Sequence, residues 1–171
     1  PTDSAVPCTW TFSAGEPSSS EGVSATWTAP RSHGTFRLTL ASGEAVQEYA
    51  VIVVVDASRW RTPTLNSYPV GLYGDGSSRG DNPESFVELG ANGGGVRLSS
   101  HFTLGEFLGH TEGAYPQYLA LDLRLVDKLE ALIDAVGREY PEPVDMNVMS
   151  GYRTPDYNRS IGNETDFSAH L

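Results

Sequence analysis

The spacing of apolar residues changes along this chain, and that change limits the class of fold it can adopt. Near the N-terminus, Phe36, Leu38 and Leu40 alternate with polar residues, which is the two-residue period of a half-buried strand. Between residues 121 and 136, apolar residues recur instead at intervals of three and four, which is the period of an amphipathic helix. The sequence therefore predicts an α+β protein.

Residues 1–57 are expected to form a small all-β domain. Short β-rich stretches at 9–12 and 23–27 precede the alternating strand, and residues 49–55 form a β-branched run suited to a strand buried on both faces. Clusters of Gly, Pro and Ser separate these stretches, as turns do. A partial β-sandwich is the expected result. The stretch 27–36 also resembles the strand–turn–strand of bacterial immunoglobulin-like modules.

Residues 58–98 have the highest density of chain-breaking residues. Turn-forming clusters at 75–78 and 92–95 frame one strand candidate at 85–89. We interpret the segment as a linker packed on its neighbours, because it is too apolar for a free tether. Its large apolar side chains are Trp60, Tyr68, Leu72, Tyr73 and Phe86. The tripeptide at 79–81 spells an adhesion motif, but its context is that of a plain turn.

Sequence signals for helices begin after residue 99. Thr103 and Glu106 have the spacing of a capping box, and Phe102 and Phe107 flank it at the positions of a hydrophobic staple. These residues predict a short helix near 104–109.

A longer helix is predicted next, with Gly137 at its end. Its apolar stripe consists of Leu121, Leu125, Leu129, Leu132 and Val136, widened by Val126 and Ile133. Charged residues lie off this stripe, so the helix is expected to bury one face. Residues 144–149 are predicted to form a strand that leads into a turn at 150–153.

Composition excludes several classes of function. The net charge of −11 argues against nucleic-acid binding, which depends on contacts from Lys and Arg to phosphate. No apolar run approaches the roughly 18 residues of a membrane span. The single cysteine, Cys8, rules out an intramolecular disulfide. It is either an unreactive thiol or the site of a lipid or an intermolecular bridge.

The segment 148–171 carries the most specific pattern in the chain. It contains S-G-Y-R-T-P at 150–155, Y-N-R at 157–159, I-G at 161–162 and S-A-H at 168–170. These words resemble the start of the catalytic core of the zinc D-Ala-D-Ala carboxypeptidase family, where a Ser and a His two positions apart open the motif S-x-H-x-x-G-x-A-x-D.

In that family the His and the Asp of the motif are metal ligands, so the resemblance implies that His170 binds Zn²⁺. A catalytic zinc site usually has three protein ligands and one open position. The other ligands and the general base are expected beyond Leu171. Residues 99–171 would thus be the incomplete N-terminal part of a hedgehog/DD-peptidase-like α+β domain, behind an Ig-like domain and inactive as it stands.

Arg153 is the candidate substrate-binding residue. A carboxypeptidase must recognise the terminal carboxylate of its substrate, and the guanidinium fork matches a carboxylate in a bidentate way. The alternative is that Arg153 braces the fold through backbone carbonyls or an acid such as Asp156. Other polar residues are expected to be structural or at the surface, namely Tyr152, Tyr157, Asn158, His33, His101 and His110.

The resemblance implies an extracytoplasmic zinc peptidase of bacterial cell-wall metabolism, acting on D-alanyl-containing peptidoglycan peptides. An N-terminus that lacks Met and an apolar targeting segment fits a secreted protein after signal-peptide removal, although a recombinantly trimmed chain would look the same. A complementary C-terminal segment or a second chain is an expected partner. The alternative function is a non-catalytic module that binds the cell wall or a protein.

Overall fold

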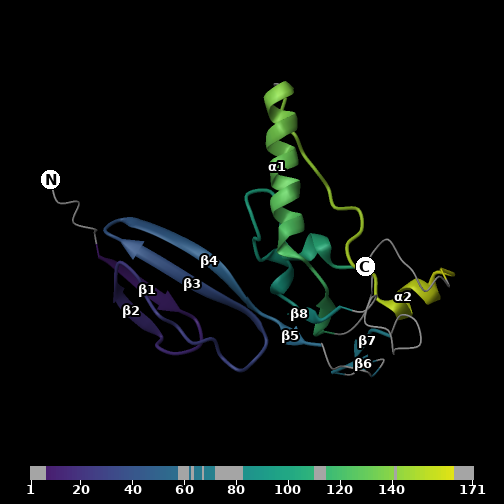
Figure 1. The fold of residues 1–171 in the computed structure, drawn as a ribbon, viewed down its shortest axis with the longest axis horizontal. Coiled ribbons are helices and arrows are strands. Elements are labelled where there is room, and N and C mark those ends of the chain that lie inside the picture. Colours follow the sequence, from purple (N-terminus) through teal and green to yellow (C-terminus); the bar gives the residue numbers. More distant parts are fainter. Residues whose placement is uncertain are drawn as a thin grey trace. The chain divides into compact units, whose positions relative to one another are not determined.

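The computed structural model describes residues 7–57, 62, 64–66, 68–71, 83–109, 115–140 and 142–163. The chain divides into two compact units, residues 1–53 and 54–171 (Figure 1). The structure is mixed α+β with antiparallel sheets and few helices, as the sequence predicts.

The first unit contains one four-stranded antiparallel sheet in the order β2-β1-β3-β4 (Figure 1). Its strands are β1 (Cys8–Phe12), β2 (Ser19–Gly22), β3 (Gly34–Ser42) and β4 (Ala45–Val53). The alternating pattern at 36–40 lies inside β3, which pairs with β1 and with β4 along its length. The described residues of this unit include no second sheet of a sandwich.

The predicted strand at 23–27 is wrong, because these residues lie outside every strand that the structure describes. They are held by a side chain instead. The ring of Trp27 stacks on Phe12 with centroids 5.3 Å apart, and its indole N–H donates to the carbonyl of Ala14 at 2.9 Å. An aromatic side chain anchors this segment, where sequence patterning suggested a backbone ladder.

β4 also differs from expectation. The run at 49–55 was expected to be a strand buried on both faces, but β4 begins at Ala45 and its residues 45–50 are all exposed. β4 is the last strand in its sheet, so among the strands that the structure describes it has a neighbour on one side only. The next strand, β5 (Val55–Asp56), pairs with β8 of the second unit.

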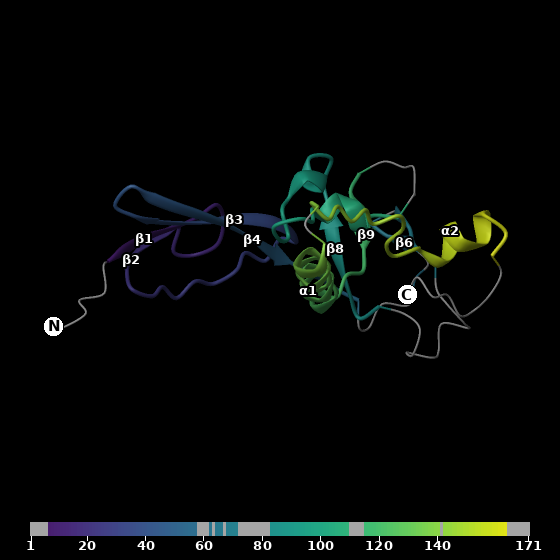
Figure 2. The same ribbon diagram turned by 90° about the horizontal axis from the view of Figure 1, so that it is seen from above.

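The second unit is built around a three-stranded antiparallel sheet, β5-β8-β9, with a separate β6-β7 pair (Figures 1 and 2). Its other strands are β6 (Thr64–Leu65), β7 (Tyr68–Pro69), β8 (Ser85–Leu89) and β9 (Gln117–Leu119). Its helices are η1 (Gly93–Gly95), η2 (Leu104–Phe107), α1 (Leu123–Glu139) and α2 (Pro155–Ser160). β8 matches the predicted strand at 85–89 and occupies the centre of the sheet.

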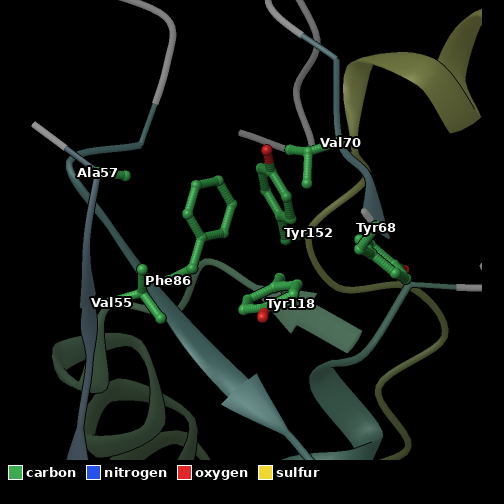
Figure 3. Packing of buried hydrophobic residues seen from close by; sticks show 7 residues of the cluster. All are labelled: Val55, Ala57, Tyr68, Val70, Phe86, Tyr118 and Tyr152. Atoms are coloured by element: carbon green, nitrogen blue, oxygen red, sulfur yellow. The ribbon is translucent and has the colours of Figure 1, made fainter. Parts of the chain in front are cut away.

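A largely aromatic cluster forms the core beside this sheet (Figure 3). Its buried members are Val55, Ala57, Tyr68, Val70, Phe86, Tyr118 and Tyr152. Phe86 and Tyr152 meet edge to face with ring centroids 5.8 Å apart, and Tyr68 and Tyr118 do so at 5.7 Å. These contacts attach the segment around Tyr152 to the sheet.

The short helix forms where its capping signals predict, as the 3₁₀ turn η2. The carboxylate of Glu106 accepts hydrogen bonds from the backbone N–H of Thr103 at 2.9 Å and from its hydroxyl at 2.8 Å. The rings of Phe102 and Phe107 pack with centroids 5.9 Å apart, which confirms the staple. Leu108 is extended, so the turn ends at 107 and not at 109.

The predicted long helix is α1, but its buried face is rotated from the predicted stripe. Val126 and Ile133 are 3% and 6% exposed, whereas Leu125 and Leu132 are 45% and 48% exposed. The helix also continues past Gly137 to Glu139. The predicted strand at 144–149 is wrong, since these residues lie outside every strand that the structure describes.

Candidate functional site

Two residues fix the backbone just before Arg153. Gly151 lies directly against η2, where an added Cβ atom would be 2.0 Å from the carbonyl oxygen of Phe107. Only glycine permits this approach of two backbones. Tyr152 is 6% exposed and packs its ring on Phe86 (Figure 3). The position of Arg153 is therefore set by the core of the second unit.

The chain after Arg153 turns at once into the short helix α2. The hydroxyl of Thr154 accepts from the backbone N–H of Tyr157 at 3.2 Å, and Pro155 occupies the first turn. Sequence analysis missed this helix, although an N-cap Thr followed by Pro is a recognised start signal. The backbone N–H of Asp156 donates to the carbonyl of Val70 at 3.1 Å, which attaches α2 to the chain beside β7.

Arg153 is half-buried at the head of α2. Its Nε donates to the hydroxyl of Ser150 at 3.1 Å, which sets the plane of the guanidinium. Asp156, the acid considered as a brace for it, forms an ion pair with Arg159 at 3.0 Å. The side chain of Asn158 is buried, since the residue is 1% exposed, and its backbone carbonyl accepts from the backbone N–H of Asn163 at 3.0 Å. This supports the expectation that Asn158 is structural.

The predicted zinc ligand, His170, lies outside the described residues, so its distance from Arg153 stays open. His110 lies outside them too, and His33 is exposed. Within the part of the chain that the structure describes, no group of three His, Cys, Asp or Glu side chains is placed to hold a metal ion.

His101 belongs to a polar cluster that sequence analysis did not find. Glu130 of α1 accepts from the backbone N–H of His101 at 2.9 Å and contacts its ring Nδ1 at 2.7 Å. Hydrogen bonds from Ser99 and then from His101 lower the pKa of Glu130 to about 2. No spacing pattern in the sequence indicates this contact, because its two residues lie 29 positions apart in the chain.

A second polar network joins β8 and β9 to Asn66. Asn66 donates to the Tyr118 hydroxyl at 2.6 Å, and that hydroxyl donates to Glu88 at 2.8 Å. Burial, together with the hydrogen bond to Glu88, raises the pKa of Tyr118 to about 12. The phenol therefore stays protonated at neutral pH, and we assign it a structural role.

No protein-family model matches this chain, and neither does any curated protein or solved structure. None of the helices in the described ranges is long and apolar enough to cross a membrane.

Proposed function

We propose that this chain is the N-terminal portion of an extracytoplasmic zinc peptidase that removes terminal residues from D-alanyl peptides of peptidoglycan. The observation that carries the proposal is the environment of Arg153. The segment S-G-Y-R-T-P holds one half-buried guanidinium between buried Tyr152 and buried Thr154. The N-terminal sheet would be the Ig-like module of such a protein.

The arrangement suits recognition of a carboxylate. A guanidinium gains most from a bidentate partner when its plane is fixed before the ligand arrives. Ser150 fixes the plane of Arg153, and Gly151 with Tyr152 fixes its backbone. A substrate carboxylate held there would fix the C-terminal end of the substrate peptide.

The described residues do not by themselves fit a zinc ion, because they contain no group of ligands for it. In this proposal His170 is one ligand, and the remaining ligands and the general base belong to a segment after Leu171. Zinc, when bound there, would activate water and polarise the scissile carbonyl. The residues of this chain bind and orient the substrate.

The experiment uses the protein with the segment that follows Leu171. We expect about one zinc per molecule by metal analysis and release of D-alanine from a peptide ending in D-Ala-D-Ala. His170→Ala should abolish both, whereas His33→Ala, at an exposed position, should change neither. A protein that sediments with insoluble peptidoglycan but holds no zinc and releases no D-alanine would be the non-catalytic binding module instead.

A further inference from the structure

β4 is a long exposed edge strand. It spans nine residues and pairs with β3 along one side, and in the described part of the chain no strand pairs with its other side. Val46 and Tyr49 are 62% and 49% exposed. A long apolar edge with unpaired backbone groups is a template for another strand. The opposite edge, β2, is only four residues long and has the polar sequence SSEG.

The register of the β3–β4 hairpin identifies the backbone groups on the outer edge. Ser42 pairs with Ala45 across the two-residue turn Gly43-Glu44, and Gly43 has a φ of 59°. In such a hairpin the pair that flanks the turn is hydrogen-bonded, and bonded and non-bonded pairs then alternate. The amide and carbonyl groups of the even-numbered residues therefore face outward. These residues are Val46, Glu48, Ala50 and Ile52.

We propose that β4 pairs in antiparallel fashion with β4 of a second copy of this chain, across a two-fold axis at Tyr49. In this register the outward-facing residues of the two copies bond to one another. Val46 lies opposite Ile52 of the second copy, and Glu48 lies opposite its Ala50. The two Tyr49 side chains meet at the axis as a cross-strand aromatic pair.

Charge favours this register over one centred on Glu48, and it is compatible with a partner of the same sequence. Glu48 is the only charged residue of β4, and Arg37 of β3 lies 3.5 Å from its carboxylate. A register centred on Glu48 would place two carboxylates directly opposite each other, which is unfavourable. Centring on Tyr49 avoids that clash and pairs all nine residues. One strand pair buries less than a standard interface, so we expect a weak dimer, with a Kd on the order of micromolar or higher.

Cysteine cross-linking tests the register in the full chain. In a Cys8→Ser background, Tyr49→Cys should form a disulfide-linked dimer under mild oxidation, because non-bonded antiparallel partners have Cα atoms about 4.5 Å apart. Gln47→Cys is the matched control on the same exposed strand. Its copies would be about 13 Å apart and should not cross-link. Absence of a cross-linked dimer with Tyr49→Cys, or equal cross-linking with Gln47→Cys, would overturn the register.

Sedimentation of the full chain from about 1 to about 500 µM tests the dimer itself. Ala50→Pro, which removes an outward amide from an edge strand, should give a monomer, whereas Ala50→Ser should still dimerise. Tyr49→Arg should also give a monomer by placing two cations at the axis, which covers the case in which the proline variant misfolds. Val23→Arg is the control for Tyr49→Arg, because it adds the same charge at a site that is 63% exposed and outside β4. It should not change the dimerisation.

Two results would refute the proposal. One is a chain that stays monomeric over the whole concentration range. The other is an oligomer that survives Tyr49→Arg but dissociates with Leu132→Glu, since that would assign the contact to the exposed side of α1.

Discussion

The carboxylate of Glu130 binds both the backbone and the ring of His101, which is 29 residues earlier in the chain. This contact joins the centre of α1 to the loop ahead of η2. The side chain of Glu130 is only 22% exposed, so the contact is partly shielded from solvent.

We predict that this contact makes stability depend on acid pH. The pKa of Glu130 is about 2 in the folded protein, below the 4.5 of a free glutamate. A lowered pKa contributes stability that is fully present above pH 4.5 and is lost as the pH falls toward 2. Thermal melts across this range should show a smaller acid-induced loss for Glu130→Gln than for the parent protein. At pH 7 that variant should lose about 1 kcal/mol. Identical acid profiles would contradict the assignment.

Gly151→Ala should be strongly destabilising. The new Cβ atom would lie 2.0 Å from the carbonyl oxygen of Phe107, so the backbone of one segment must move. We expect a loss of about 3 kcal/mol or more in denaturant unfolding. Gly137→Ala is the control, because nothing lies within 4 Å of its added Cβ. Within α1 that change should stabilise the protein by about 0.5–1 kcal/mol. Equal effects at the two glycines would be inconsistent with a close approach at Gly151.

Two neighbouring residues of α1 should respond differently to truncation. Ile133→Ala should cost about 2–4 kcal/mol, because Ile133 is 6% exposed. Leu132→Ala should cost less than about 1 kcal/mol, because Leu132 is 48% exposed. Urea unfolding of both variants measures the difference. A larger loss of unfolding free energy with Leu132→Ala than with Ile133→Ala would mean that the leucine stripe predicted from sequence is the buried face of α1.

Arg153→Lys should separate substrate binding from stability in the protein that includes the segment after Leu171. Lys keeps the positive charge but lacks the paired N–H donors with which a guanidinium binds a carboxylate. We therefore expect kcat/KM to fall about ten- to a hundredfold, equivalent to about 1.4–2.8 kcal/mol. The melting temperature should barely change. A substrate with an amidated C-terminus should show no such difference between the two proteins.

Arg159→Lys provides the control for this test. Arg159 is a half-exposed arginine in α2, six residues after Arg153; it is paired with Asp156 and should tolerate the change. A drop in melting temperature with Arg153→Lys, together with equal losses on both substrates, would identify Arg153 as a structural brace.

Signals that involve neighbouring residues predicted the elements correctly. Patterns of apolar residues were less reliable in predicting which face of a helix or strand is buried. The capping box at Thr103 and the strand at 85–89 depend on neighbouring residues, and both form as predicted. The buried face of α1 was misjudged because leucines and valines lie on adjoining sides of the helix, and the tertiary partner decides between them. The prediction that β4 is buried on both faces was wrong for a related reason. An apolar run does not reveal whether its strand lies at the edge of a sheet.

The candidate site was only partly accessible to sequence reasoning. The S-G-Y-R-T-P segment was recognised from its residues, but its attachment through Gly151 to η2 depends on a contact between segments more than 40 residues apart. The cluster of Ser99, His101 and Glu130 was missed for the same reason, because its members share no spacing pattern.

The close packing of Gly151 against the backbone of Phe107 has a consequence for protein engineering. A peptide copied from residues 150–160 would carry the arginine without the surfaces that hold it still. Transplanting this proposed carboxylate-binding element into another scaffold would require η2 for the glycine and β8 for the ring of Tyr152. The smallest portable unit is thus a discontinuous one, assembled from three separate stretches of the chain.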